Sequence, residues 1–295
     1  MVQTGRIEFT HLDKVFWPGK GYTKGALVAY YQALEPYIFP YLQDRPCNLF
    51  RQPNGIKDKA FFQKDVQSLN LPSWTQTVKV YSETNEKDIE YLVCNSFEAV
   101  LYQVQLGCIE INPWNSRLQQ LKCPDWAVID IDPDGNRFNE VVSVALQVKK
   151  VCDELSIPCY PKTSGKSGMH IFIPMEAKYN YVQVRQFAEL IANLVHRTTD
   201  PLTSLVRDPQ KRRGKIYLDY LQNRESQTLA APYCVRPTVA ASVSAPLNWS
   251  EVNKNLRPDN FTIINMQQRL KEVGDLWKPV IGKGIDLAKV LGQIE

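Results

Sequence analysis

The segment Trp126-Ala-Val-Ile-Asp130-Ile-Asp132-Pro-Asp-Gly135 decides the fold. Its apolar run predicts a central β-strand, and residues two positions apart on a strand point to the same face. Asp130 and Asp132 are therefore neighbours, and burying two unpaired carboxylates costs on the order of several kcal/mol per ion. A divalent cation such as Mg²⁺ or Mn²⁺ would remove that cost. An acidic turn that closes the strand explains this segment alone equally well.

A third acid, Asp219, interrupts a second apolar strand predicted at 215–221. A carboxylate in the middle of such a strand needs a partner. Three acids on two neighbouring strands can hold two metal ions about 3.5–4 Å apart, and such a pair of ions stabilises the attacking and leaving oxygens of phosphoryl transfer. The alternative is that Asp219 pairs with a structural arginine, Arg212 or Arg213.

A Gly/Ser-rich loop, Lys162-Thr-Ser164-Gly-Lys166-Ser167-Gly168-Met-His170, leads into a further strand. Successive backbone N–H groups in such a loop can bind an anion, and Ser164, Lys166 and Ser167 add donors. The loop lacks the Walker A pattern. It indicates a phosphate site beside His170, although surface turns and core histidines share these features.

Basic and aromatic side chains elsewhere are candidates for phosphate and base contacts. Arg236 precedes a proline and could hold a phosphate with two hydrogen bonds, or form a salt bridge at the rim. Arg51 and Lys64 flank Phe61 and Phe62, which could stack on bases or form a local apolar cluster.

A basic run beside Trp17 contains Lys14, Lys20 and Lys24. It could bind a terminal phosphate of DNA, and a solvated lysine face is the plain alternative.

The rest of the chain predicts both helices and strands. Thr23 is an expected N-cap, and apolar periodicity predicts helices that alternate with short strands. No repeat or low-complexity linker divides the chain, which favours one domain whose N-terminal third packs on a mixed sheet. We expect helices at 23–42, 96–106, 138–155 and 180–195 and after about 260, and strands at 47–52, 108–111 and 169–174.

Composition excludes several classes of protein. With 44% hydrophobic residues in 295, the chain can form a sizeable core and is not expected to be disordered. The net charge of +4 neither requires nor excludes nucleic acid. The seven cysteines show no C-x-x-C spacing, so we expect reduced thiols and no structural zinc. No signal peptide or membrane span is predicted, and a cytoplasmic location is expected.

Seven segments together resemble one known family. They are HLDKVFWP…YTK (11–24), RQPNG…FFQK (51–64), GCIEINPW (107–114), DWAVIDIDP (125–133), KTSGKSGMHIF (162–172), YLDYLQN (217–223) and TLAAPYCVRP (228–237). In this order they resemble the polymerase domain of bacterial DNA ligase D, of the archaeo-eukaryotic primase superfamily. The resemblance implies an α+β fold, with a primase-like catalytic core of two mixed β-sheets and flanking helices.

The same resemblance implies how one domain over residues 1–295 is arranged. A 5′-phosphate-binding and helical region at about 1–45 would pack on a catalytic core at about 46–260, followed by C-terminal helices at about 261–295.

The implied function is template-directed addition of ribo- or deoxyribonucleotides to primer 3′-ends at gaps and double-strand breaks in bacterial non-homologous end joining. The implied cofactors are two Mn²⁺ or Mg²⁺ ions. The implied partners are 5′-phosphorylated DNA, the end-binding protein Ku, and ligase and phosphoesterase modules in the same or another chain, near the nucleoid. A primer-independent primase, a metal-dependent nuclease and a non-catalytic end-tethering module are the alternatives.

The resemblance also implies roles for individual residues. One departure stands out: Asn112 occupies a position where many relatives carry His, and asparagine can donate a hydrogen bond but cannot become charged. His11 also replaces what is often Asn. The implied metal ligands are Asp130, Asp132 and Asp219; the nucleotide site comprises Arg51, Lys64, Asn112, Ser164, Lys166, Ser167, His170, Gln222 and Arg236; and DNA is contacted by His11, Lys14, Lys24, Phe61 and Phe62.

Overall fold

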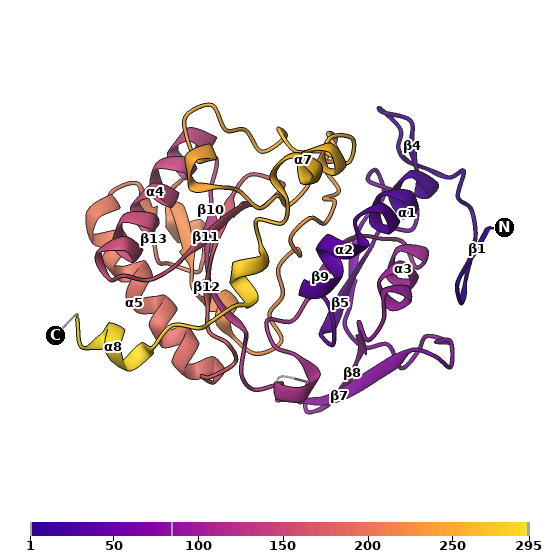
Figure 1. Cartoon of the computed structure of the whole chain (residues 1–295), viewed down its shortest axis with the longest axis horizontal. Helices are drawn as coiled ribbons and strands as arrows, with labels where there is room; N and C mark the ends of the chain where they lie inside the picture. The colour runs from indigo at the N-terminus through magenta and orange to yellow at the C-terminus, as the bar shows by residue number, and fades with distance from the viewer. Residues whose placement is uncertain (1, 84, 294–295) are drawn as a thin grey trace.

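The computed structural model describes residues 2–83 and 85–293. Two five-stranded sheets lie side by side, as Figure 1 shows, with the N-terminal third of the chain on one and the middle of the chain on the other. The expected two-sheet α+β architecture is confirmed. No helix in the described ranges is both long and apolar enough to cross a membrane.

The first sheet is built around β5 (Pro46–Arg51), which has neighbours on both sides. All its described pairings are antiparallel, so only the second sheet is mixed. The strands that join β5 are β6 (Phe61–Gln63), β7 (Gln76–Ser82), β8 (Lys87–Val93) and β9 (Cys108–Pro113).

The second sheet has the order β11-β12-β10-β14-β13, with the acid-bearing strand β10 (Trp126–Asp132) at its centre. The β13–β14 pair is parallel and the other pairs are antiparallel. This central place follows from the apolar side chains on both faces of β10, which are buried from Trp126 to Ile129. The other strands are β11 (Tyr160–Thr163), β12 (Met169–Pro174), β13 (Thr203–Ser204) and β14 (Ile216–Asp219).

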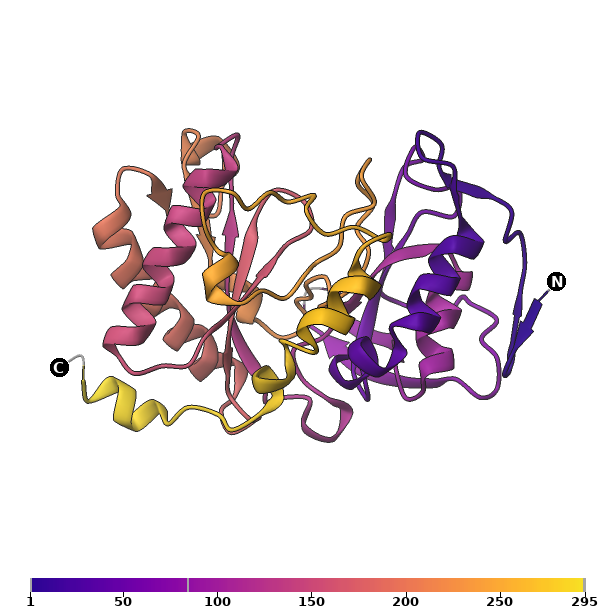
Figure 2. The same cartoon turned by 45° about the horizontal axis from the view of Figure 1, so that its top comes forward.

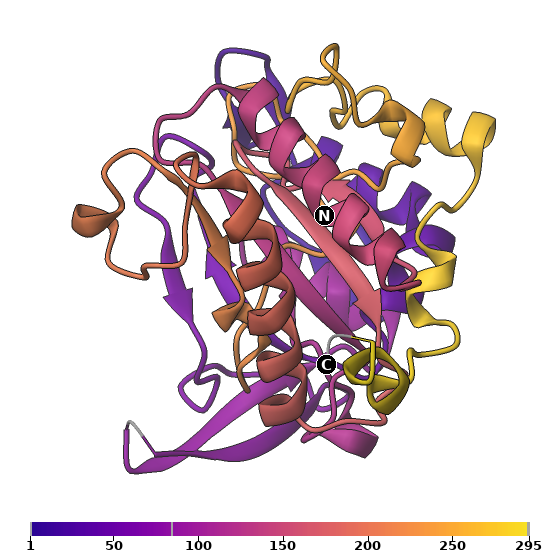
Figure 3. The same ribbon diagram turned by 90° about the vertical axis from the view of Figure 1, so that its left-hand side faces the viewer.

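Two long helices, α4 (Phe138–Glu154) and α5 (Tyr181–Thr199), cover one face of the second sheet (Figure 3). The buried side of α4 includes Val141, Val144, Ala145 and Val148, spaced as one face of a helix requires. At the start of α5, the Asn180 side-chain oxygen accepts a hydrogen bond from the Gln183 N–H, and the Gln183 side-chain oxygen accepts one from the Asn180 N–H, which completes a capping box.

The N-terminal helix begins as expected but ends earlier. Thr23 caps α1 (Lys24–Ala33) by accepting from the Ala26 N–H at 3.2 Å. The predicted continuation to residue 42 is wrong, because proline has no N–H to donate to a helical hydrogen bond. After α1 the chain forms two new short elements, α2 (Glu35–Ile38) with Pro36 in its first turn and a 3₁₀ turn at Phe39–Tyr41 that contains Pro40. The helix expected at 96–106 is α3 (Phe97–Gln105), and the Ser96 side chain caps it by accepting from the Ala99 N–H.

Two further expectations need correction. β14 ends at Asp219, two residues early, because the chain turns into a 3₁₀ helix at Leu221–Asn223. The helical tail is three short pieces: α7 (Met266–Val273), a 3₁₀ helix at Lys278–Ile281 and α8 (Leu287–Leu291). The remaining elements are β1 (Val2–Thr4), β2 (Ile7–Phe9), β3 (Val15–Trp17), β4 (Tyr22–Thr23), α6 (Pro209–Arg212) and 3₁₀ turns at Leu118–Gln120 and Trp249–Glu251.

Residues far apart in sequence join the two sheets. The core of the first sheet also contains Trp126 and Phe172 of the second sheet and Met266 and Trp277 of the tail. Figure 2 shows the yellow helix α7 returning beside α1. Buried Arg45 pairs with Asp125 and lies 4.0 Å from the Trp126 ring, which ties the two sheets together. The two sheets are thereby held so that side chains from both can face one site.

Candidate functional site

The three acids predicted from the sequence lie at the carboxyl ends of two neighbouring strands. Asp130 pairs directly with Asp219 across β10 and β14, and with His170 across β12. Burial, followed by the charges of Asp219 and Asp132, raises the pKa of Asp130 well above its ordinary value. Burial also raises the pKa values of Asp219 and Asp132. An added positive charge would therefore be favourable here.

The acids differ in their surroundings. Asp219 accepts hydrogen bonds from the Leu221 N–H at 2.8 Å and from Gln222 Nε2 at 3.2 Å. Asp132 is 54% exposed, and its Oδ2 lies 3.8 Å from Arg212, so the expected alternative partner of Asp219 stands beside Asp132 instead. Within residues 2–83 and 85–293, no three Asp, Glu, His or Cys side chains are close enough as they stand to hold a metal ion.

The donor set nevertheless fits a hard divalent cation. Asp130 and Asp219 offer carboxylate oxygens from directly paired strand positions, and burial destabilises both charged forms, to which the charge of Asp219 adds at Asp130. Mg²⁺ and Mn²⁺ prefer such oxygen ligands and need one or two protein carboxylates, since water and substrate phosphates complete the shell. Asp130 and Asp219 are the best-placed pair for such an ion, with the more exposed Asp132 beside them.

His170 connects the acids to a buried lysine. Its Nε2 lies 3.4 Å from Asp130 Oδ1, and its Nδ1 lies 2.8 Å from Lys162 Nζ. Lys162 also donates to the Ala230 carbonyl and to Ser244 Oγ, and burial lowers its pKa to about 7. Burial, followed by the charges of Lys162 and Arg236, lowers the pKa of His170 well below its ordinary value. His170 is therefore a neutral imidazole at neutral pH.

The predicted phosphate loop is folded around Ser164. The Ser164 hydroxyl accepts from the Lys166 N–H at 3.1 Å and the Gly168 N–H at 3.0 Å, so two backbone donors of the loop are used internally. The Lys166 and Ser167 side chains are exposed. The loop therefore offers its side chains, more than its backbone, to an anion.

Gly168 brings this loop against the acid-bearing strand, and Gly168→Ala is expected to be destabilising. A Cβ at this position would lie 2.3 Å from the Ile131 carbonyl oxygen, so β10 or the loop would have to move. We expect a loss of about 1–3 kcal/mol in the free energy of unfolding. Thermal unfolding measures it, with Gly19→Ala as control because a Cβ there meets nothing within 4 Å. Equal stability of the two variants would contradict the close approach.

Arg236 is buried and held from both sides of the site. Its Nε donates to Glu110 on β9 at 2.8 Å, and its Nη1 donates to the Ser164 carbonyl at 2.5 Å. Glu110 also lies 3.8 Å from Lys166 Nζ and accepts from Asn112 Nδ2 at 3.3 Å. Arg236, Lys166 and Asn112, predicted from three separate segments, therefore meet around one carboxylate, and Ser164 joins them through Arg236.

Sequence reasoning did not single out Glu110 or Lys162 as site residues. The available signal was a charged side chain inside a strand of buried residues, Cys108-Ile-Glu-Ile111, two positions before Asn112 and thus on the same face. Lys162 lay in the quoted loop segment, but nothing in the sequence indicated its complete burial.

Arg51 lies in a different place from the rest of the predicted nucleotide set. With His11, Lys14 and Lys24 it lines a hollow of about 210 Å³. Arg51 donates to the Leu106 carbonyl and to Gln63, whereas Lys24 donates to the Thr10 and Gln105 carbonyls and to Gln105 Oε1. The structure therefore groups Arg51 with the predicted DNA-binding residues.

The aromatic pair is exposed, and exposed Lys64 lies two residues after Phe62. Phe62 is 62% exposed, and its ring lies 4.6 Å from that of Phe50, which in turn lies 5.8 Å from Lys166 Nζ. Phe61 lies beneath Arg51, at 5.4 Å. This arrangement favours the stacking interpretation over a buried apolar cluster.

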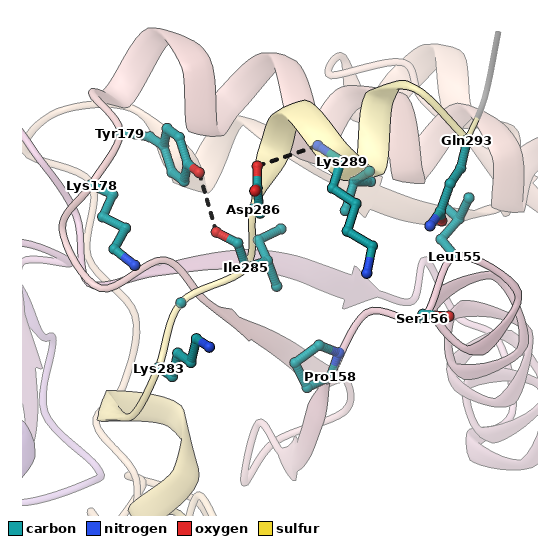
Figure 4. A pocket seen from close by; sticks show the side chains of 12 residues that line it. Leu155, Ser156, Pro158, Lys178, Tyr179, Lys283, Ile285, Asp286, Lys289 and Gln293 are labelled. Atoms are coloured by element: carbon teal, nitrogen blue, oxygen red, sulfur yellow. Dashed lines mark hydrogen bonds between the residues drawn. The ribbon is translucent and has the colours of Figure 1, made fainter.

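A hollow of about 820 Å³ beside α8 contains none of the predicted site residues. Figure 4 shows its lining, which includes Lys178, Lys283 and Lys289. The size of a hollow alone therefore does not identify a functional site. The chemistry of the acids, Arg236 and His170 makes them the better candidates.

The chain belongs to the LigD primase-polymerase domain family, whose model matches residues 23–277. It is 31% identical over 271 residues to the bifunctional non-homologous end joining protein LigD of Bacillus subtilis, covering 91% of this chain and 43% of that protein. It is 30% identical over 285 residues to the multifunctional LigD of Pseudomonas aeruginosa, covering 95% of this chain and 33% of that protein. The family expected from the sequence is confirmed, and the chain spans less than half the length of these relatives.

A solved structure has the same fold. The polymerase domain from Mycobacterium tuberculosis ligase D in complex with DNA matches with a TM-score of 0.86 at 24% identity, covering 96% of this chain and 100% of that one. This match shows that nearly the whole chain has the fold of that domain.

Proposed function

We propose that this chain is a template-directed nucleotidyl transferase that adds nucleotides to primer 3′-ends at gaps and double-strand breaks in bacterial non-homologous end joining. The observation that carries the proposal is the pairing of Asp130 with Asp219 beside the basic side chains of Arg236 and Lys166. The family membership and the names of the LigD relatives support it.

The chain's own residues divide the work between positioning and electrostatics. Divalent ions held by Asp130, Asp132 and Asp219 would supply positive charge for activating the 3′-hydroxyl and for neutralising the leaving pyrophosphate. Arg236 and Lys166 carry positive charge for the triphosphate. His170 lies between Lys162 and Asp130 and is neutral. The buried Lys162–His170 pair therefore carries at most one positive charge beside Asp130.

DNA would be held by two other surfaces. The exposed Phe61 and Phe62 offer rings on which bases can stack. The hollow lined by His11, Lys14 and Arg51 offers positive charge to a 5′-phosphate. Ku and ligase and phosphoesterase modules are the partners that end joining would require.

Primer extension on a gapped duplex tests the proposal. We would supply a 5′-phosphate at the gap, Mn²⁺ or Mg²⁺, and each ribo- or deoxynucleotide singly. Template-matched addition that stops in EDTA is the expected result. Strand shortening without nucleotides would indicate a nuclease, synthesis on unprimed single strands a primase, and tight DNA binding without addition a tethering module.

Phe62→Ala is expected to weaken DNA binding while leaving the fold intact. Stacking on one base contributes about 1–3 kcal/mol, roughly a fivefold to hundredfold change in affinity. Fluorescence anisotropy with the gapped duplex measures it, and Val182→Ala on α5 is the control because Val182 is also exposed, at 57%. Equal affinities for the two variants would remove Phe62 from the DNA surface.

A further inference from the structure

We infer that Glu110 is a positioning residue of the proposed nucleotide site, which orients the Arg236 guanidinium so that its free N–H donors meet the phosphates of an incoming nucleotide. This inference rests on the proposed function. Glu110 is an anionic side chain in a site that has to attract the anionic phosphates of a nucleotide. Charge complementarity alone would not predict a carboxylate there.

The geometry fixes Arg236 at two points from two different sheets. Glu110, 5% exposed on β9 of the first sheet, accepts from Arg236 Nε at 2.8 Å. The loop that joins β11 and β12 of the second sheet presents the Ser164 carbonyl to Nη1 at 2.5 Å. Because a guanidinium is planar, two such contacts set both the position and the plane of the group.

These two contacts use two of the five N–H donors of the guanidinium. The described residues provide hydrogen-bond acceptors to Nε and Nη1 of Arg236 and none to Nη2. Both donors of Nη2 and the second donor of Nη1 therefore remain for phosphate oxygens. Glu110 contacts Nε alone, so it can orient Arg236 without using these donors.

The surrounding charges match an anionic ligand. Around the Glu110 carboxylate stand Arg236 and Lys166, two cations for one anion. Asn112 donates to the second carboxylate oxygen at 3.3 Å, so this neutral side chain supports Glu110 and adds no charge. The excess of positive charge remains for the phosphates, while Glu110 holds Arg236 when no nucleotide is bound.

The two effects of Glu110 on a nucleotide have opposite signs, which makes them separable. Its negative charge repels the phosphates, whereas its acceptor oxygen orients Arg236. Glu110→Gln removes the charge and keeps an oxygen for Arg236 Nε; Glu110→Ala removes both. A role in charge alone predicts that both variants bind nucleotide more tightly, and a positioning role predicts that they differ.

Calorimetric titration with ATP and Mg²⁺, without primer, measures the difference. We expect Glu110→Ala to bind ATP about tenfold or more weakly than Glu110→Gln, and Glu110→Gln to remain within about threefold of the unmodified chain or tighter. Glu251→Ala is the matched control, since it breaks the Glu251–Arg269 ion pair (2.7 Å) outside the site. ATP binding by Glu110→Ala as tight as by Glu110→Gln would overturn the inference.

Two further comparisons keep the result decisive. If the unmodified chain does not bind ATP, the proposed function fails, whereas binding with equal affinities of the two Glu110 variants refutes the inference alone. If Glu110→Ala does not fold because it leaves Arg236 buried without its partner, the double variant Glu110→Ala/Arg236→Ala removes both charges. Equal ATP affinities of the double variant and Arg236→Ala support action through Arg236, and a further loss contradicts it.

Discussion

Asp130→Asn is expected to reduce nucleotide addition by roughly a thousandfold or more, because it removes a negative ligand from the centre of the acid cluster. That loss corresponds to about 4 kcal/mol of transition-state stabilisation, within the several kcal/mol that a bound metal ion supplies. Primer extension under single-turnover conditions measures it. Asp153→Asn on the surface of α4 is the control, since Asp153 pairs only with Lys149 of its own helix among the ion pairs of the described residues.

The same substitution is expected to stabilise the metal-free protein at neutral pH. The pKa of Asp130 is raised by burial, then by Asp219 and Asp132, above the ordinary value of 3.8. Between these two pKa values the folded state binds the proton more tightly than the unfolded state, so stability falls as pH rises through that window and stays lower above it. Asparagine does not ionise, so its variant escapes this loss, and we expect a Tm a few degrees higher.

Thermal unfolding in EDTA from pH 4 to pH 8 distinguishes this electrostatic cause from a general change in packing. The difference in Tm between Asp130→Asn and the unmodified chain should shrink as the pH falls, because the Asp130 carboxyl group then becomes neutral, as the asparagine amide always is.

The catalytic prediction has its own contradicting outcome. Nucleotide addition within tenfold of the unmodified rate by a folded Asp130→Asn protein would show that the acid cluster is not the catalytic site.

Arg236→Lys is expected to raise the KM for nucleotide by roughly ten- to hundredfold with a much smaller change in kcat. Lysine keeps the charge, but a single ammonium cannot hold Glu110 and the Ser164 carbonyl while also presenting a flat edge to a phosphate. A loss of about 1.4–2.8 kcal/mol corresponds to this range. Steady-state extension with varied nucleotide concentration measures both constants.

The matched control is Arg269→Lys, since Arg269 makes a comparable two-pronged contact with Glu251 away from the acids. It should leave both constants unchanged. If Arg236→Lys instead lowered kcat at an unchanged KM, Arg236 would act in the transition state and not in nucleotide binding, and the arrangement around Glu110 would need another explanation.

Local sequence signals predicted the elements whose cause is local. The cap at Thr23, the helix at 96–106 and the apolar periodicity of α4 and α5 depend on residues within one or two turns, and the structure confirms them. The signal for the early end of α1 is also local, because it consists of Pro36 and Pro40. The end was predicted too late because apolar residues continue at helical spacing beyond α1. The β7–β8 hairpin was not singled out, although Val78 and Val80 on β7 and Ile89 and Tyr91 on β8 alternate as one face of a strand requires.

By itself, the sequence determined the family through its seven matching segments, and the resemblance implied the two-sheet α+β architecture. It also marked the acids as candidates, because alternation on a strand places Asp130 and Asp132 on one face whatever the rest of the chain does. Only the tertiary structure decided which partners these candidates meet. In the structure Asp130 pairs with Asp219 and His170, and Arg51 lies in the hollow lined by Lys14 and Lys24. Glu110 of the first sheet contacts Arg236. Such contacts join residues up to 126 positions apart, as Glu110 and Arg236 are, and only the packing of the two sheets brings them together.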